Sequence, residues 1–445
     1  MSSMRRFAAI YIVVALLLVA CTGSTGSSAG ASTAPAESTE PAESTGAMEP
    51  VTIEWWHIQN NDPGMSLWAE VAQEFMDEHE NVTINITVLE NETFKTRIVN
   101  AMQAGEPPDL FQSWGAGGLQ AQVDAGLVTD VTDAVSPWIG NLNEAAVGMF
   151  QVDDRQYGIP FDLGMVGLWY NKDLFADAGI DAPPATWEEL LTDVQLLKDA
   201  GITPIAVGEG DKWPGAFWWE YLALRFAGGE AMLQATIDGS FDAEPFVRAG
   251  EELERLIGME PFQDGFLATP WEGAGGEAAL VANGQAAMHL MGQWAPGTQR
   301  ANAENGEGLG DALGWFPFPA VDGGAGAPTE AIGGGNGFAV GRDAPAEAVD
   351  FLEYITSMDV ANRWGETNSG ILPVTIGSEA SISDEFLQLV LEGRGNATFV
   401  QLYLDQATTP DIGNAINDAI QVLFAGQATP EETANAVAEA VRSGG

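Results

Sequence analysis

The chain has 445 residues, of which 64 are acidic and 16 basic, so its formal net charge is -48 at pH 7. A negative field of this size repels phosphate backbones and anionic headgroups, which argues against nucleic-acid binding and direct lipid binding. With 46% hydrophobic residues and 14 tryptophans, the chain is too rich in large apolar side chains to be disordered throughout, and it is long enough for two lobes.

The first residues have the features of a secretory signal over residues 1–20. Arg5 and Arg6 precede an apolar run, and Cys21 directly follows small residues. The run is shorter than the roughly 20 apolar residues of a spanning helix, so an uncleaved membrane anchor is the weaker alternative. The stretch resembles the lipobox of bacterial lipoproteins. That resemblance implies cleavage before Cys21, the only cysteine of the chain, and a lipid anchor on it.

Residues 22–50 consist mainly of Ser, Thr, Gly, Ala, Pro and Glu. Such a segment cannot bury enough apolar surface to offset the entropy of ordering. We therefore predict that residues 21–50 form the lipidated cysteine and a disordered tether.

The chain beyond residue 50 predicts an α/β fold. Residues 51–56 predict a buried strand, 65–79 place apolar residues at helical spacing, and 82–88 alternate apolar with polar residues. A strand, a helix and a strand in this order form a βαβ unit and imply a parallel sheet. A helix over 93–104 and a short strand over 109–112 are expected next.

Helix signals recur further along the chain. Thr186 with Glu189, and Thr429 with Glu432, have the spacing of a capping box and predict helix starts. Residues 346–358 have the apolar spacing of an amphipathic helix.

Five segments in this order resemble one family of proteins. They are IEWWH at 53–57, PDLFQSW at 108–114, GLWYNKDLF at 167–175, GQAAM at 284–288 with GQW at 292–294, and GGGNGFAV at 333–340. Together they resemble bacterial extracellular solute-binding protein family 1, the receptors of ABC sugar importers that include the maltose, raffinose and xylo-oligosaccharide receptors. The resemblance covers nearly all of the chain after the tether.

The resemblance implies a two-lobed periplasmic-binding-protein-like fold (type II), each lobe a mainly parallel sheet flanked by helices. It implies an N-lobe of residues 51–161 and 333–369 and a C-lobe of 162–332 and 370–445, with crossings near Asp162, Ile332 and Gly370. It also implies capture of a di- or oligosaccharide by hinge closure, delivery to the transmembrane subunits of a permease, and a monomer. The expected location is extracytoplasmic, with the chain lipid-anchored to the outer face of the cytoplasmic membrane or periplasmic.

A sugar-binding cleft needs planar polar side chains beside aromatic faces. Such side chains follow the predicted strands, where open α/β folds place their ligands, and they recur where the family's cleft loops should lie. Some of the tryptophans are equally suited to the core, and Asp162 to a helix cap or a salt bridge. The candidate ligand-binding residues are His57, Gln59, Gln112, Trp114, Asp162, Trp213, Trp218, Trp294, Trp315 and Asn336.

Motifs of catalysis and of metal binding are missing from the sequence. The three histidines have no metal-ligand spacing, no nucleophile elbow occurs, and the glycine run at 333–337 lacks the pattern of a phosphate loop. We therefore expect a receptor with no catalytic residue, metal or cofactor. Two alternatives stay open: a secreted glycoside-active enzyme, whose two carboxylates would face each other across a cleft, and a surface sugar sensor or adhesin.

Overall fold

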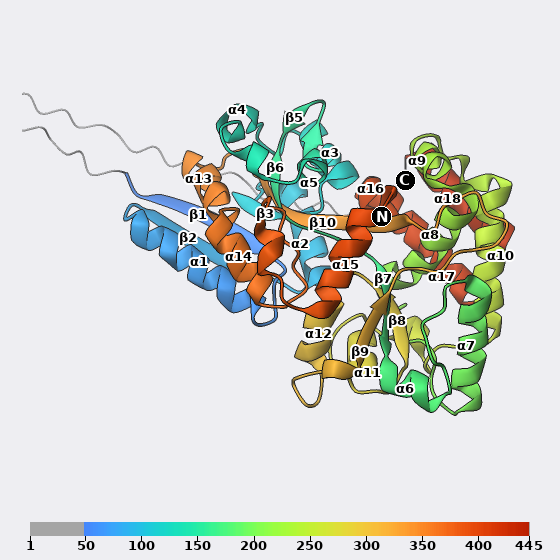
Figure 1. The fold of residues 1–445 in the computed structure, drawn as a ribbon. Helices are drawn as coiled ribbons and strands as arrows, with labels where there is room; N and C mark the ends of the chain where they lie inside the picture. Colours follow the sequence, from blue (N-terminus) through green and yellow to red (C-terminus); the bar gives the residue numbers. More distant parts are fainter. Residues whose placement is uncertain (1–48, 445) are drawn as a thin grey trace, which may run out of the picture. The chain divides into compact units, whose positions relative to one another are not determined.

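The computed structural model describes residues 49–444 of the chain (Figure 1). The predicted signal peptide, Cys21 and the tether up to residue 48 lie outside the described residues. Within residues 49–444, no helix combines the length and the apolar composition needed to cross a membrane.

The structure contains short strands and many helices. The strands are β1 (Val51–His57), β2 (Val82–Val88), β3 (Leu110–Ser113), β4 (Gln151–Val152), β5 (Arg155–Gln156), β6 (Gly158–Met165), β7 (Gly167–Asn171), β8 (Met288–Met291), β9 (Leu313–Phe316), β10 (Glu330–Val340) and β11 (Phe399–Leu402). The helices up to residue 238 are α1 (Gly64–Glu78), α2 (Asn91–Ala104), α3 (Ala116–Asp124), α4 (Thr132–Val135), α5 (Glu144–Gly148), α6 (Lys172–Asp177), α7 (Trp187–Asp199), α8 (Trp213–Ala227) and α9 (Gly229–Asp238). The later helices are α10 (Glu244–Gly258), α11 (Glu277–Ala282), α12 (Ala295–Asn302), α13 (Ala346–Ile355), α14 (Met358–Glu366), α15 (Glu385–Asn396), α16 (Leu404–Ala407), α17 (Pro410–Phe424) and α18 (Pro430–Ser443).

The predicted elements at the start of the domain are confirmed, and they begin the larger sheet. β1 pairs in parallel with β2 and with β3, so the βαβ unit forms as expected. β10 lies antiparallel to β3 and β6 and parallel to β11, which gives the order β11-β10-β3-β1-β2, with β6 beside β10. Both capping boxes are also present, at Thr186 with Glu189 and at Thr429 with Glu432. The helix predicted over 346–358 ends at Ile355, because Ser357 caps a separate helix, α14.

Two large hydrophobic cores give the molecule two lobes. In the first, Trp55 of β1 packs with Phe338 of β10 and Phe351 of α13. In the second, Trp169 of β7 and Trp219 of α8 are both fully buried. Figure 1 shows β10 running from the region of β1 and β3 toward α8. The predicted two-lobed α/β fold is confirmed, and we call the parts around the first and second cores the N-lobe and the C-lobe.

The sheet of the C-lobe differs from the expectation of mainly parallel strands. β7 is its central strand, and β8 and β9 both pair with it in antiparallel directions. The chain from β7 to β8 passes through several helices, so this connection is not a short βαβ crossover of the kind that imposes parallel pairing. The first strands of the chain gave no information about this second sheet.

Three segments pass between the cores. On β6, Ile159 packs in the first core and Met165 in the second, and β10 runs beside it in the opposite direction. Ile371 and Val374 pack in the first core, whereas Leu372 and Ile382 pack in the second. We therefore propose that the third crossing begins at about Ile371, next to the expected Gly370.

Helix α8 is apolar on all sides and is buried over nearly its whole length, as expected for a helix inside a core. Its one basic residue, Arg225, is 1% exposed and donates hydrogen bonds to four backbone oxygens, those of Phe318, Pro319, Pro328 and Glu330, at 2.7 to 3.3 Å. The guanidinium also lies over the ring of Tyr221. This side chain joins α8 to the segment that leads into β10.

Replacing Arg225 with Leu should lower the stability of the C-lobe strongly. The substitution leaves buried carbonyl oxygens without donors, which costs about 3 kcal/mol or more in total. Arg248→Leu is the matched control, because Arg248 is more exposed and donates to a single carbonyl, that of Gly323. Chemical unfolding of both variants tests this, and equal stabilities would contradict the role assigned to Arg225.

Candidate functional site

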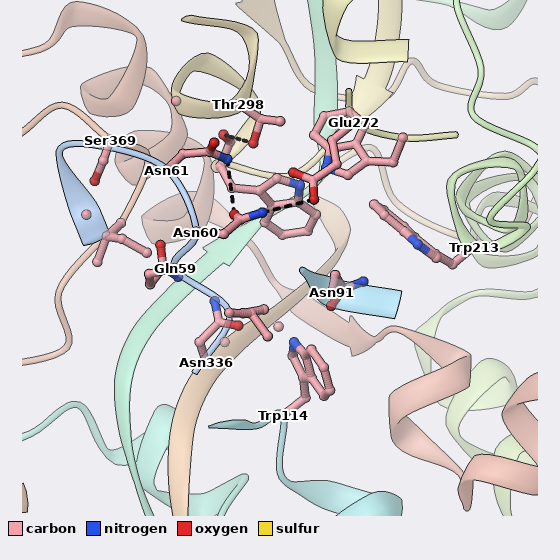
Figure 2. A pocket seen from close by; sticks show the side chains of 18 of the residues that line it. Gln59, Asn60, Asn61, Asn91, Trp114, Trp213, Glu272, Thr298, Asn336 and Ser369 are labelled. Atoms are coloured by element: carbon pink, nitrogen blue, oxygen red, sulfur yellow. Dashed lines mark hydrogen bonds between the residues drawn. The ribbon is translucent and has the colours of Figure 1, made fainter. Parts of the chain in front are cut away.

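A cavity lies where segments of the two lobes meet (Figure 2). The space that no atom fills measures about 1120 Å³, including the part open to solvent. The N-lobe contributes the loop after β1, the start of α2 and the residue after β3. The C-lobe contributes the start of α8, the loop before α11 and the start of α12. β10 contributes the glycines and Asn336 that lie between them.

Indole rings reach the cavity from both lobes. Trp114 comes from the N-lobe, whereas Trp213, Trp271 and Trp294 come from three different segments of the C-lobe. The ring centroid of Trp213 lies 5.9 Å from that of Trp271 and 6.3 Å from that of Trp294. The three C-lobe rings therefore form one continuous aromatic wall.

Amide and hydroxyl side chains lie between the rings. Gln59, Asn60 and Asn61 follow β1, Asn91 begins α2, and Thr298 comes from α12. In Figure 2 these groups lie around the same space as the labelled indoles. The Asn60 amide donates to the Glu272 carboxylate at 3.2 Å, and this hydrogen bond joins the two lobes across the cavity.

A buried carboxylate, Asp162, lies behind this cavity. Its side chain accepts hydrogen bonds from Asn336 (2.7 Å) and Gln293 (3.0 Å), and from the backbone N–H of Leu372 (2.9 Å). Asp162 is 0% exposed. Burial raises its pKa to about 6, against the opposing effect of the three donors.

Two glycines of β10 allow the backbones to come this close. A Cβ at Gly335 would lie 2.1 Å from the Asp162 carbonyl oxygen, and one at Gly334 would lie 2.5 Å from the Tyr403 ring. The glycine run at 333–337 therefore serves close packing of β6 and β10 beside the cavity, which agrees with its lack of a phosphate-loop pattern.

Charged side chains line one side of the cavity. Lys95 lies 3.0 Å from Glu92 and above the ring of Trp213, whose centroid is 5.8 Å from its ammonium group. Glu272 and Asp405 also line the cavity. Burial raises the pKa of both carboxyls, and Lys95 counteracts this effect at Asp405.

Five of the residues singled out from the sequence line the cavity: Gln59, Trp114, Trp213, Trp294 and Asn336. Two others lie directly behind it. Gln112 donates to the Asn336 side chain at 2.8 Å, and Asp162 accepts from Asn336. The structure thus brings these seven residues together, although their contact with a ligand stays a prediction.

The remaining three candidates do not line the cavity, and we correct these predictions. His57 is 1% exposed and its ring packs against Trp55 in the N-lobe. Trp218 is 1% exposed and packs on Phe318, because α8 is surrounded by the C-lobe core. Trp315 is 8% exposed and lies beside Trp169 in the small antiparallel sheet. All three are core residues.

Sequence reasoning missed several residues of the cavity. Trp271 and Glu272 were not selected, although a Trp-Glu pair inside the glycine-rich loop 269–276 is unusual for a buried segment. Asn60 and Asn61 follow the first strand directly and had the same positional signal as Gln59. Tyr403 and Asp405 come from the last part of the chain, where no motif pointed to a site.

Comparison with curated proteins finds binding proteins of ABC transporters. An uncharacterised ABC transporter extracellular-binding protein of Pyrococcus horikoshii is 27% identical over 242 residues, which cover 52% of this chain and 53% of that protein. The chain thus spans about half the length of this relative. The sn-glycerol-3-phosphate-binding periplasmic protein of Pectobacterium atrosepticum is 23% identical over 425 residues, covering 88% of this chain and 91% of the relative.

Solved structures share the fold over almost their whole length. A protein from work on xylan utilisation by the thermophilic bacterium Caldanaerobius polysaccharolyticus superposes with a TM-score of 0.80 at 27% identity, covering 87% of this chain and 99% of that chain. A chitin oligosaccharide binding protein gives a TM-score of 0.80 at 24% identity, covering 88% of this chain and 98% of that chain.

The model of the bacterial extracellular solute-binding protein family matches residues 59–362, well over half of the chain. The chain therefore belongs to the bacterial extracellular solute-binding protein family.

Proposed function

We propose that this protein is the substrate-binding component of an ABC importer and that it captures an uncharged saccharide in the cavity between its lobes. The observation that carries the proposal is the aromatic wall of Trp213, Trp271 and Trp294 on one lobe, with Trp114 and amide side chains on the other. Indole faces suit the flat C–H patches of a sugar ring. Amides both donate to hydroxyls and accept from them.

The spread of the rings supports a ligand of more than one sugar unit. Four indoles from four separate segments surround the cavity, and a single pyranose ring stacks on at most two faces. The similarity to a chitin oligosaccharide binding protein and to a protein from xylan utilisation supports a di- or oligosaccharide as well.

The charges of the cavity favour a neutral ligand over an anionic one. Of the side chains that line it in the described part of the chain, Lys95 carries the positive charge, and Glu92 already lies 3.0 Å from it. Glu272, Asp405 and Asp62 bring carboxylates to the same space. A phosphate ester would meet these carboxylates without a free cation, so glycerol 3-phosphate, which the Pectobacterium relative is named for, is disfavoured here.

The two lobes capture the ligand by closing about the hinge. Contacts from Trp114 and from the three C-lobe indoles act on the same ligand only when the lobes are close together. The free energy of those contacts then shifts the protein toward its closed form. The hydrogen bond from Asn60 to Glu272 adds a direct contact between the lobes in that form.

The closed, loaded protein delivers its ligand to the transmembrane subunits of a permease. We propose that it acts as a monomer without catalysis or a cofactor, outside the cytoplasm, as the family's extracellular character supports. A lipid on Cys21 would attach it to the outer face of the cytoplasmic membrane.

Ligand binding should raise the melting temperature of the purified protein, because a ligand that binds only the folded state stabilises it. We expect this effect with one or more of xylobiose, raffinose and chitin oligosaccharides, and none with glycerol 3-phosphate. Trp294→Ala should weaken binding by about 2 kcal/mol, as for a central aromatic contact, whereas the core control Trp218→Phe should leave affinity unchanged. Stabilisation by glycerol 3-phosphate alone, or cleavage of the oligosaccharides, would overturn the proposal.

Asp162 should make the free energy of unfolding depend on pH. Its pKa is raised from 3.8 to about 6 in the folded protein, so between these values the folded form holds a proton that the unfolded form has lost. The free energy of unfolding should therefore fall by up to about 3 kcal/mol as pH rises from about 4 to 6. Asp162→Asn lacks this titration, so its free energy of unfolding should fall less steeply from pH 4 to 7 than that of the wild type. Other carboxyls with a raised pKa, such as Asp405, contribute to the slope in both proteins. Identical slopes would refute the assignment.

A further inference from the structure

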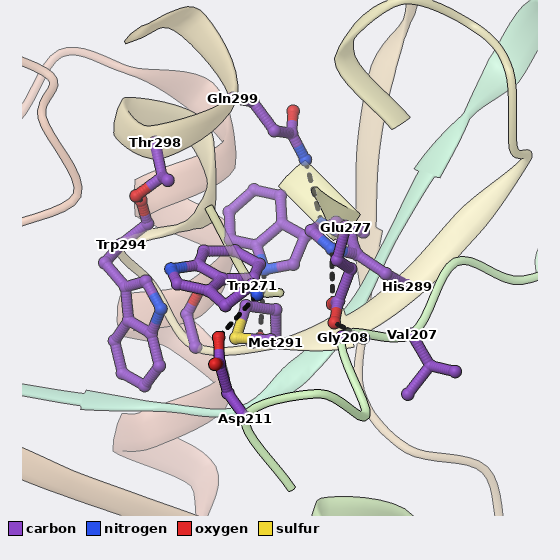
Figure 3. Close-up of polar contacts among 12 residues, drawn as sticks. Val207, Gly208, Asp211, Trp271, Glu277, His289, Met291, Trp294, Thr298 and Gln299 are labelled. Atoms are coloured by element: carbon purple, nitrogen blue, oxygen red, sulfur yellow. Dashed lines mark hydrogen bonds and ion pairs between the residues drawn. The ribbon is translucent and has the colours of Figure 1, made fainter. Parts of the chain in front are cut away.

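A chain of buried polar side chains lies directly behind the aromatic wall (Figure 3). The imidazole of His289 lies 2.9 Å from the Glu277 carboxyl through Nδ1 and 2.9 Å from the Gln299 amide through Nε2. The second oxygen of Glu277 accepts the backbone N–H of Gly208 at 2.5 Å. All three side chains are at most 1% exposed, so none of them reaches a ligand.

This chain of side chains connects the segments that carry the wall. Gly208 lies five residues before Trp213, and Glu277 lies six residues after Trp271. His289 is in β8, which ends just before Trp294, and Gln299 is in α12, which begins just after it. Each C-lobe segment that presents an indole is therefore connected to the other such segments through one of these four positions.

Trp271 is held most directly. Its ring stacks on the imidazole of His289, with centroids 5.8 Å apart and planes 18° apart. Its backbone N–H donates to the Asp211 carboxylate at 2.7 Å. A Cβ at Gly208 would lie 2.9 Å from the Trp271 nitrogen and 3.0 Å from the Glu277 carboxyl. The segments are therefore too close together at Gly208 for a larger side chain. Figure 3 shows the Trp271 ring beside His289, with Trp294 at the edge of the same group.

We propose that His289, held between Glu277 and Gln299, is a positioning residue that fixes the orientation of Trp271 and the spacing of the aromatic wall for ligand binding. The inference rests on the proposed saccharide-binding function of that wall.

A polar group suits this position because hydrogen bonds have direction, whereas apolar contacts tolerate rotation and sliding. A stacking platform has to hold its rings within a fraction of an ångström, and buried side-chain networks supply that restraint. Burial lowers the pKa of His289 to about 3 and raises that of Glu277. Burial thus disfavours the charged form of each side chain.

The main test is His289→Leu, compared with His79→Leu as a matched control. The His79 ring also stacks on an aromatic neighbour, Phe75, but it lies in the N-lobe at the end of α1. We expect His289→Leu to weaken binding of the saccharide identified by thermal shift by about tenfold or more, equivalent to about 1.4 kcal/mol. The indole N–H resonance of Trp271, assigned through Trp271→Phe, should also move in the ligand-free protein. His79→Leu should change neither.

A second pair of variants separates positioning from general stability. Glu277→Gln has the same shape, and its amide can donate to His289 while its carbonyl accepts from Gly208. Gln299 can then turn to accept from the other imidazole nitrogen. We expect this variant to bind the saccharide as the wild type does, whereas Glu277→Leu should show the loss seen in His289→Leu. If His289→Leu does not fold, the comparison of Glu277→Gln with Glu277→Leu tests the positioning role instead.

The inference is overturned if His289→Leu or Glu277→Leu binds within about twofold of the wild type, a difference too small to reflect a lost restraint. It is also overturned if Glu277→Gln loses as much affinity as Glu277→Leu. Failure of the wild type to bind any saccharide would instead overturn the proposed function. In that case the Trp271 resonance of ligand-free His289→Leu still tests the positioning role, and an unmoved resonance overturns it.

Discussion

The carboxylate of Asp162 is the point at which the separate parts of this molecule are held together. It accepts hydrogen bonds from β10 through Asn336, from the segment after β8 through Gln293, and from the third crossing through Leu372. A buried carboxylate is costly unless donors surround it, so the three donors and the acceptor fix one another's positions. The glycines of β10 are a consequence of the same contact, because a side chain at Gly335 would collide with the backbone of Asp162.

From this junction the two lobes contribute different chemistry to the cavity. The C-lobe supplies most of the aromatic surface, on segments that a buried polar network holds in place. The N-lobe supplies Trp114 and the amides that follow β1 and begin α2. A receptor built this way gains full affinity only when both surfaces meet the ligand, which couples binding to closure.

The net charge of the whole chain affects its surface, whereas the charged side chains of the cavity affect which ligand it accepts. A net charge of -48 keeps the surface strongly hydrated and repels other anions. Inside the cavity, Glu272, Asp405 and the pair of Lys95 with Glu92 leave little free positive charge. Family membership alone does not distinguish a sugar from a phosphate ester, since one relative is named for sn-glycerol-3-phosphate and a solved structure of the same fold for chitin oligosaccharide. The proposed preference for a sugar therefore rests on the side chains that line the cavity.

The sequence by itself determined the fold class, the opening βαβ unit, both capping boxes and the cavity positions that directly follow strands, such as Gln59 and Trp114. Those features depend on local periodicity, on capping chemistry and on the rule that strand ends meet at one sheet edge. Tertiary structure alone decided which tryptophans face the cavity. In α8 every face is apolar, so no periodicity distinguishes Trp213, at the open end of the helix, from Trp218, inside the core. Only the folded chain brings Trp271, His289 and Tyr403 to the site, because their neighbours there are far away in sequence and their burial depends on packing between segments rather than on any local pattern.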